Sequence, residues 1–280
     1  MSTPSPSPRT RFAAVMQAPE ETLDLALAAL LVAAEEYPQL PVSMYLQRLD
    51  QLAERVRDRL ADETAPLIVL QELRRVLADE EGFRGDVQNY YDPRNCHLND
   101  VLDRHLGIPI TLGIVWLEVG WRLGLPLGGV NFPGHFLLRY EGESMRVLVD
   151  PYYGGKLRFE DEMQGLLDQA YGDGVPFDSR FLRTATREDI IVRMLSNLKT
   201  IHLNHVPDEF RALSAIERIL LIRPDAIDEV RDRGMLLARI GRNAEALPDL
   251  QRYLETAPEA DDANRVRLLI QSLRTDGSSE

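Results

Sequence analysis

His135 and Asp150 are the residues of this chain best suited to acid–base chemistry. An imidazole can accept a proton near neutral pH, and a carboxylate beside it fixes which ring nitrogen carries the proton. His135 opens the segment HFLLRY and Asp150 closes the segment MRVLVD, and both segments have the composition of strands. Gly142 lies between them. Antiparallel pairing across a short hairpin brings such ends together, so we expect the two side chains to meet.

Two side chains, Cys96 and Thr111, are candidates for a nucleophile beside this pair. Cys96 is the only cysteine and lies near the start of an expected short helix, where thiolates are stabilised. A lone cysteine is nevertheless more often a small buried residue than a catalyst. Thr111 lies two residues into the next expected helix, but its hydroxyl is a poor nucleophile without activation and commonly bonds the backbone at a helix start.

Asp92, Arg94 and Asn95 form the densest polar cluster outside these positions. One interpretation is a turn in which Asp92 and Asn95 cap backbone amides while Arg94 makes a salt bridge. The other is that the three line a cleft with the His–Asp pair and bind a carboxylate or amide at the end of a peptide. Nearby tyrosines would either wall that cleft or pack in the core: Tyr90, Tyr91, Tyr152 and Tyr153.

No motif predicts a metal or cofactor site. His97 and His105 are eight residues apart, and neither H-E-x-x-H nor H-x-x-E-H occurs. A single cysteine excludes a multi-thiolate zinc site and an intramolecular disulfide. The sequence also lacks a Gly-rich phosphate loop and a G-x-S-x-G elbow. We therefore expect neither a metal nor a cofactor.

The elements that must position these residues are helical first and extended later. Apolar spacing predicts helices over 23–37, from Pro41 onward, and over 66–78. Asn95 is expected to cap a short helix that ends at Gly107. Pro109 suits a first helical turn, and the helix from there to Arg122 should be the most buried of the chain. Strands are expected over 127–132, 135–140 and 145–150.

The C-terminal third contains an internal repeat of 34 residues. Shifting the sequence by that period aligns Ala212 with Ala246 and Pro224 with Pro258. Stacked helical pairs need small residues where helices cross and a proline where the second helix ends. The repeat over 193–260 resembles tetratricopeptide repeats, and 261–275 suits a capping helix. Such an array either binds a protein or peptide partner or only supports its neighbour.

The motifs of the first part resemble one known family. DPRNCHLNDVL, GIPITLGIVWLEVGWRLGLPL, FPGHFLLR and LVDPYYGG occur in the order found in the transglutaminase-like family named after the bacterial SirB1 protein, where this domain precedes tetratricopeptide repeats. The resemblance implies an α+β fold: a helical N-terminal part, a papain- or transglutaminase-like core with a small antiparallel sheet, and an α-helical array. We expect a disordered tail over 1–17, the transglutaminase-like domain over 18–186, and the repeats over 187–280.

The same resemblance places Pro109 where a transglutaminase has its nucleophilic cysteine, and proline has no reactive side-chain atom. It therefore implies a non-catalytic interaction or regulatory protein with a degenerate site. The alternative is a cysteine-dependent acyl hydrolase or transferase in which Cys96 works with His135 and Asp150. A ligand of the remnant cleft would also meet Asp92, Arg94, Asn95 and Thr111.

The charge of the chain limits the classes of partner. Its formal net charge of −13 disfavours nucleic acids and anionic membranes as primary partners. No stretch approaches about 18 consecutive apolar residues, and the N-terminus lacks an apolar signal-peptide core. We therefore expect a cytoplasmic protein whose partner is another protein or a peptide.

Overall fold

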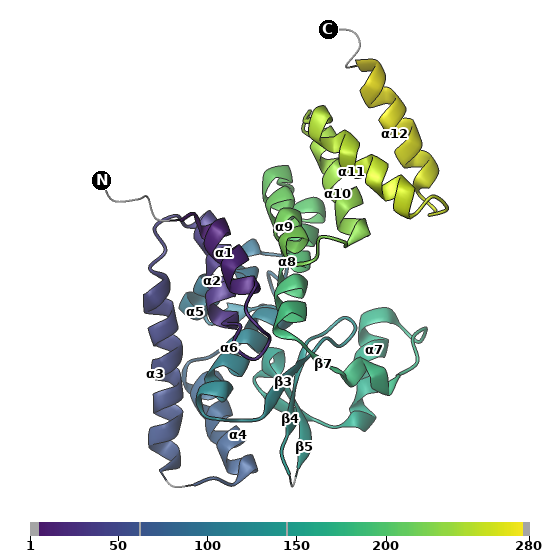
Figure 1. Cartoon of the computed structure of the whole chain (residues 1–280). Coiled ribbons are helices and arrows are strands. Elements are labelled where there is room, and N and C mark those ends of the chain that lie inside the picture. The colour runs from purple at the N-terminus through teal and green to yellow at the C-terminus, as the bar shows by residue number, and fades with distance from the viewer. Residues whose placement is uncertain (1–5, 62, 144, 277–280) are drawn as a thin grey trace, which may run out of the picture. The chain divides into compact units, whose positions relative to one another are not determined.

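The chain divides at Met194–Leu195 into two units of different architecture. The computed structural model describes residues 6–61, 63–143 and 145–276 (Figure 1). The first unit, Met1–Met194, is α+β, and the second, Leu195–Glu280, is helical over its described residues. The sequence placed the boundary between residues 186 and 187, whereas the structural division falls inside helix α8 (Arg187–Asn204).

Part of the tail that was expected to be disordered is helical. Residues 1–5 lie outside the described residues, but Pro8–Met16 form helix α1. The Ser7 hydroxyl accepts a hydrogen bond from the Thr10 amide, and Pro8 occupies the first turn, where a missing N–H costs nothing. Phe12 is fully buried. The Ser–Pro alternation therefore begins a capped helix, and the prediction of disorder is wrong for this segment.

The helical N-terminal part agrees with the expected apolar spacing. It comprises α2 (Leu25–Glu36), α3 (Val42–Leu60) and α4 (Pro66–Arg74), which continues as a π-helical segment over Arg75–Glu80. Nine residues of α2 are buried, because its Ala- and Leu-rich sequence is apolar on every side. In α3 only one stripe is buried, formed by Leu49, Leu52, Ala53 and Val56.

The expected helix from Asn95 to Gly107 is wrong in its bounds. Pro93–Cys96 form a 3₁₀ turn, α5 spans Leu98–Arg104, and His105 ends it in the left-handed region with φ 59°. Leu106–Gly107 then pair as strand β2 with β1 (Arg84–Gly85) in parallel. Asn95 does not cap a helix, because its side chain is bonded elsewhere.

Helix α6 (Pro109–Arg122) is the central element of the first unit, as predicted. All twelve residues from Pro109 to Gly120 are buried. Its one buried carboxylate, Glu118, accepts a hydrogen bond from the Ala26 amide at 2.9 Å and pairs with Arg122. Burial raises the pKa of Glu118. Glu118 thus satisfies an N-terminal amide of α2 inside the core.

A five-stranded antiparallel sheet packs against α6. Its order is β6–β5–β4–β3–β7. The strands are β3 (Leu127–Val130), β4 (Leu137–Glu141), β5 (Arg146–Asp150), β6 (Lys156–Arg158) and β7 (Thr184–Ala185). The three expected strands are present, whereas the short edge strands β6 and β7 were not predicted.

The two faces of the sheet are covered by different helices. Helix α6 packs against β3 and β4, and a Cβ added at Gly120 would lie 2.4 Å from Leu127. On the other face Leu137 and Leu148 form a cluster with Met163 and Leu167 of α7 (Met163–Tyr171). Because side chains alternate along a strand, Asp150 shares that second face with Leu148.

The second unit has the expected antiparallel helical pairs. It contains the end of α8 with α9 (Glu209–Ile222), α10 (Ile227–Arg239), α11 (Asn243–Thr256) and α12 (Ala263–Asp276). The repeat residues Ala212 and Ala246 are both fully buried in one core. A Cβ at Gly234 would lie 2.9 Å from Leu250, so this position requires a small residue. Pro207 lies between α8 and α9.

Candidate functional site

His135 and Asp150 meet as the hairpin geometry predicted. His135 Nε2 lies 2.9 Å from Asp150 Oδ1. Asp150 is fully buried, and 11% of the His135 side chain is exposed. Because a carboxylate only accepts hydrogen bonds, this contact assigns the proton to Nε2 and leaves Nδ1 as an acceptor. An imidazole held in this way is suited to accept a proton or a hydrogen bond through Nδ1.

Asp150 also has a cationic partner, Arg158, that the sequence did not reveal. Arg158 Nε donates to Asp150 Oδ2 at 2.9 Å, from the end of the neighbouring strand β6. The Tyr153 amide also donates to Asp150 Oδ1, at 3.3 Å, because Asp150 caps the 3₁₀ turn Pro151–Tyr153. A buried carboxylate with three donors is fixed in place, so the orientation of His135 is fixed with it.

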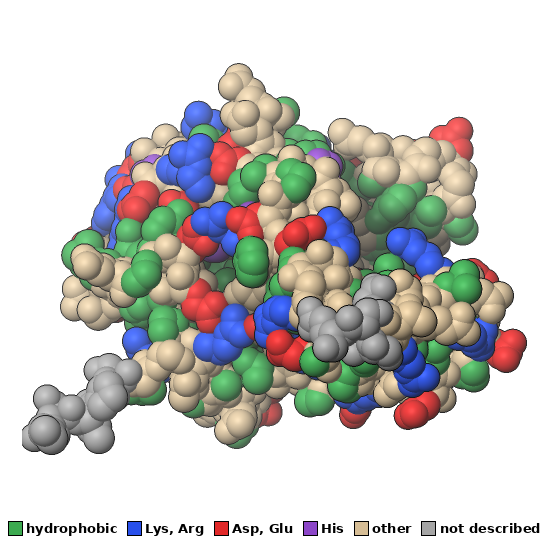
Figure 2. Space-filling view, turned by 90° about the horizontal axis from the view of Figure 1, so that it is seen from above, with side chains coloured by type: hydrophobic (Ala, Val, Ile, Leu, Met, Phe, Trp, Pro, Cys, Tyr) green, Lys and Arg blue, Asp and Glu red, His purple; other side chains and the backbone are tan. Residues whose placement is uncertain are grey.

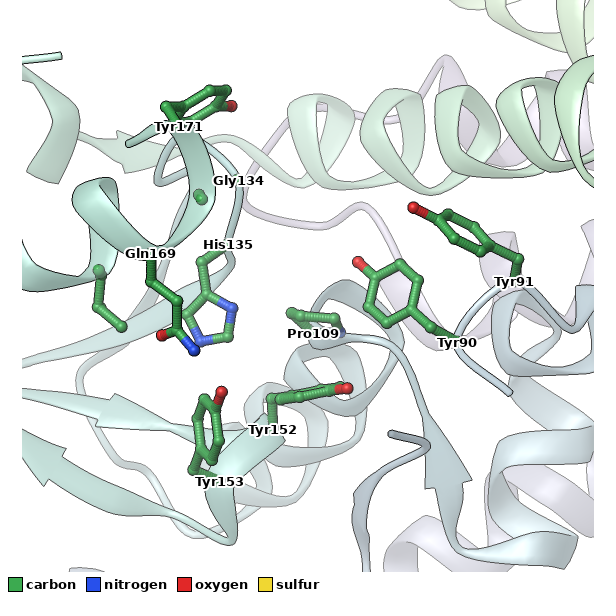
Figure 3. Close-up of a pocket in the computed structure, with 11 residues that line it drawn as sticks. Tyr90, Tyr91, Pro109, Gly134, His135, Tyr152, Tyr153, Gln169 and Tyr171 are labelled. Carbon is green, nitrogen blue, oxygen red and sulfur yellow. The ribbon is translucent and has the colours of Figure 1, made fainter. Parts of the chain in front are cut away.

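A pocket of about 510 Å³ opens in front of this pair. Figure 3 shows His135 between Gln169 and Pro109, with Tyr152 and Tyr153 on one side and Tyr90 beyond Pro109. Volumes of this size accommodate small ligands or one or two residues of a peptide. Eleven residues line the pocket: Tyr90, Tyr91, Pro109, Gly134, His135, Tyr152, Tyr153, Leu166, Gln169, Ala170 and Tyr171.

Of the two roles considered for the four tyrosines, the structure places them in the wall of the pocket. The rings of Tyr90 and Tyr152 lie 6.2 Å apart, those of Tyr152 and Tyr153 lie 5.3 Å apart, and both pairs meet edge to face. His135 contacts Tyr152 in the same manner at 5.9 Å. Burial raises the pKa of Tyr90 to about 12 and also raises that of Tyr152. Their phenols are therefore protonated hydrogen-bond donors at neutral pH.

Arg193 of α8 holds the loop that carries His135. Its guanidinium donates to the carbonyl oxygens of Phe132 at 3.1 Å and of His135 at 2.6 Å. It also lies 5.9 Å from the centre of the Phe136 ring. Burial lowers the pKa of Arg193. Arg193 was not among the residues predicted for the site, because it lies in the segment expected to belong to the repeats.

Thr111 and Asn95 are buried beneath the pocket in structural hydrogen bonds. Thr111 Oγ1 donates to the Asn95 carbonyl at 2.6 Å and accepts from the Ile108 amide at the start of α6. Asn95 Nδ2 donates to the Asn89 carbonyl at 2.7 Å, and its Oδ1 accepts from Arg104. Neither side chain lines the pocket. Both connect the 89–96 segment to the first turn of α6.

Asp92 and Arg94 follow the turn interpretation. Asp92 accepts from the Arg94 amide at 2.9 Å and pairs with the Arg94 guanidinium at 2.6 Å. This pairing contributes to a lowered pKa of Asp92, against the opposing effect of burial. Arg94 is exposed, and neither residue lines the pocket. Of the polar residues that the sequence assigned to the cleft, the structure thus brings together only His135 and Asp150.

Cys96 is separate from this pocket. It is fully buried and does not belong to the pocket lining. Burial raises the pKa of its thiol, which disfavours the thiolate that nucleophilic chemistry needs. The helix-start environment expected to lower its pKa is absent, because α5 begins two residues later, at Leu98.

Four lining residues of α7 were not identified from the sequence: Leu166, Gln169, Ala170 and Tyr171. No motif in the sequence marks these positions. Their role depends on how α7 crosses the sheet, which is a tertiary feature. Among the lining residues that were missed, Gly134 alone belongs to a quoted motif, FPGHFLLR. Its φ of 69° lies in the left-handed region, in the loop before His135.

Comparison with known proteins places this geometry in a family. The model of the transglutaminase-like superfamily matches residues 43–196, and that of a tetratricopeptide repeat matches 198–271. A UPF0162 protein of Xylella fastidiosa is 35% identical over 252 residues, which are 89% of each chain. The chain belongs to the transglutaminase-like superfamily, in its SirB1-type branch. In this transglutaminase-like protein the domain is followed by tetratricopeptide repeats.

Two further likenesses are more distant. A UPF0162 protein of Vibrio cholerae is 30% identical over 202 residues, which cover 72% of this chain and 74% of that one. A crystal structure of menin, whose title describes a binding site for Mixed Lineage Leukemia protein, has a TM-score of 0.44 and 10% identity. It covers 88% of this chain and 69% of the menin chain.

The described part of the chain contains neither a cluster of metal-ligating side chains nor a helix able to cross a membrane. Within residues 6–61, 63–143 and 145–276, no three His, Cys, Asp or Glu side chains are grouped so that they could hold a metal ion. Over the same residues, no helix has the length and apolar character needed to cross a membrane.

Proposed function

We propose that this protein is a non-catalytic interaction protein, in which the transglutaminase-like pocket binds a ligand without transforming it. The observation that carries the proposal is the position of Pro109. It is the first residue of α6 and lines the pocket with His135. The resemblance of the sequence to transglutaminases aligns this proline with their nucleophilic cysteine, which supports the proposal. The His–Asp contact is present, whereas a proline side chain offers no nucleophilic atom for it to activate.

The position of Cys96 supports the same proposal. An acyl enzyme needs a nucleophile within hydrogen-bond reach of its base, about 2.6–3.2 Å. Cys96 is fully buried outside the pocket lining, and burial favours its neutral thiol. The alternative enzyme would therefore require both exposure of Cys96 and a new pairing with His135.

The repeats supply the second half of the proposal. Tetratricopeptide repeats generally mediate protein–protein interaction. In the second unit an apolar groove between α10 and α12 is lined by Met235, Ala238, Val266 and Leu269, with Arg239 and Arg265 at its sides. We assign the docking of a protein partner to this array, and a cytoplasmic, regulatory setting fits the acidic chain.

Restoring a thiol tests the proposal. Pro109→Cys, made together with Cys96→Ser, puts the only thiol at a helix start facing His135. We expect its pKa to fall below the ordinary value of about 8.5, as thiols at helix N-termini and beside imidazoles do. The measurement is the alkylation rate by iodoacetamide as a function of pH.

The matched control adds His135→Ala to the same background. Loss of the imidazole should return the thiol pKa toward its ordinary value and slow alkylation at pH 7 by about tenfold. An alkylation profile that does not respond to His135→Ala would remove the basis of the proposal. So would acyl hydrolase activity of the natural chain that Cys96→Ser abolishes, because that result would establish the cysteine enzyme.

A further inference from the structure

The pocket contains hydrogen-bonding groups that the protein does not use. The hydroxyls of Tyr90, Tyr152, Tyr153 and Tyr171 have no hydrogen-bond partner among the residues that the structure describes. The same holds for the Gln169 amide, and His135 uses only Nε2. These groups face the pocket in Figure 3, and most of them donate. A ligand rich in acceptor oxygens would satisfy them.

Near the pocket, two buried carboxylates have arginine partners, whereas one arginine has no carboxylate partner among the described residues. The carboxylate of Asp150 is matched by Arg158, and that of Asp86 by Arg104 at 3.2 Å. Arg193 differs, because no carboxylate of a described residue lies within 4.0 Å of its guanidinium. Its three acceptors are the amide oxygen of Asn131 and the carbonyls of Phe132 and His135, all neutral.

An unbalanced, largely buried cation next to a pocket favours an anion inside it. Arg193 donates a hydrogen bond to the backbone carbonyl of His135, whose residue lines the pocket. Burial raises the pKa of Tyr90, and the charge of Arg193 opposes this rise, so its field reaches the pocket. A desolvated charge without a counter-charge costs free energy that a bound anion recovers. The local field therefore favours a carboxylate over a neutral amide.

We propose that the pocket binds the carboxylate at the C-terminal end of a peptide, between the tyrosine hydroxyls and the positive field of Arg193, with an aromatic or apolar last side chain against the tyrosine rings. This rests on the proposed function, because a ligand that is bound and released unchanged is assumed. Edge-to-face rings at 5.1–6.2 Å are suited to a further ring. Tyr153 and Tyr171 are 47% and 54% exposed, so such a ring can reach them.

Three probes test this on the full natural chain by isothermal titration calorimetry. They are the tripeptide Ala-Ala-Phe with a free carboxylate, the same tripeptide as its C-terminal amide, and acetate. We expect the free acid to bind at least about tenfold more tightly than the amide, because charge-assisted hydrogen bonds are about twice as strong as neutral ones. Acetate should bind more weakly than the tripeptide acid, because it lacks the apolar side chain.

Two variants of Arg193 separate the effect of its charge on binding from its effect on the structure of the His135 loop. Arg193→Gln should remove the preference for the acid, and Arg193→Lys, which keeps the charge, should retain most of it. Because Arg193→Gln also loosens the His135 loop, the second measurement uses the natural chain: raising salt from 50 mM to 500 mM should weaken the acid several-fold and leave the amide unchanged.

Each remaining outcome has one meaning. Equal affinities for acid and amide, no binding of either at about 10 mM, or acetate binding as tightly as the peptide would each overturn the inference. Conversion of the tripeptide amide during the titration would contradict the proposed function instead, because the pocket would then perform chemistry.

Discussion

At the scale of single residues, the site is organised around the buried carboxylate of Asp150. It fixes His135 on one side and Arg158 on the other, with both contacts at 2.9 Å. Removing one partner of such a buried pair leaves an uncompensated charge, which typically costs about 3–5 kcal/mol. A site with this arrangement can orient a ligand, and under the proposed function it does so without a covalent step.

The environment of Cys96 gives a prediction at this scale. Its folded pKa is raised by burial, so the thiolate fraction of the native protein at pH 8 is smaller than that of an ordinary thiol with a pKa of about 8.5. We expect no labelling by a disulfide-exchange reagent at pH 8 in the native chain and complete labelling in guanidinium. The measurement is the absorbance of the thiolate that the reagent releases. Stoichiometric labelling of the native protein would support the alternative function, a cysteine-dependent enzyme.

Residue types and spacing predicted the His–Asp contact, because strand register determines which ends of a hairpin meet. They did not predict Arg193 or Arg158, since both reach the site from elements whose packing has no sequence signature. Asn95 and Thr111 were polar enough to suggest a ligand, but they satisfy backbone groups around the start of α6. Polarity alone does not separate a binding group from a buried structural hydrogen bond.

At the scale of elements, α6 positions the pocket by close approach to the sheet. A Cβ at Gly113 would lie 2.4 Å from the Phe136 ring, next to His135. Similarly, a Cβ at Gly85 would lie 2.3 Å from Tyr152, and one at Gly155 would lie 2.1 Å from Trp116. These glycines let β1, the 3₁₀ turn after β5 and α6 converge, which sets the distance between Pro109 and the tyrosine walls.

Gly113→Ala therefore provides a test at this scale. We expect it to destabilise the first unit by about 1–3 kcal/mol, because the added methyl overpacks against the buried Phe136 ring. The matched control is Gly165→Ala in α7, where nothing lies within 4 Å, and we expect it to stabilise by about 0.5–1 kcal/mol. Urea unfolding followed by tryptophan fluorescence is suitable because both tryptophans, Trp116 and Trp121, lie in α6. Equal destabilisation by the two substitutions would contradict this account.

At the scale of the whole molecule, acidic and basic side chains are interspersed on the surface despite the negative net charge. In the view of Figure 2, acidic and basic side chains alternate with apolar ones instead of forming one acidic field. Many arginines are paired locally, as Arg55 is with Glu80 at 3.0 Å and Arg233 with Asp249 at 2.6 Å. The net charge of −13 therefore describes solubility and long-range repulsion better than it describes a binding surface.

The location of the domain boundary yields the last prediction. The sequence placed it before Arg187, because the repeat pattern begins in α8, yet the first turns of α8 complete the transglutaminase-like unit. Arg187 donates to the Leu23 carbonyl at 2.6 Å and lies 4.4 Å from the centre of the Trp121 ring. Ile190 is buried, and Arg193 holds the His135 loop. A fragment ending at residue 186 lacks all three side chains.

We expect the fragment 1–186 to be less stable than the fragment 1–194 by at least about 3 kcal/mol, since loss of one buried isoleucine side chain alone costs about 2–5 kcal/mol. Tryptophan-detected urea unfolding of both fragments measures the difference. Ile190→Ala and Arg193→Gln in the full chain separate the lost contacts from the effect of truncation. If both fragments unfold at the same urea concentration, the boundary at 186 is correct and α8 belongs to the repeats alone. If they differ as expected, any comparison of partners with and without the repeats must keep residues 187–194, because a shorter fragment would lose its pocket together with its repeats.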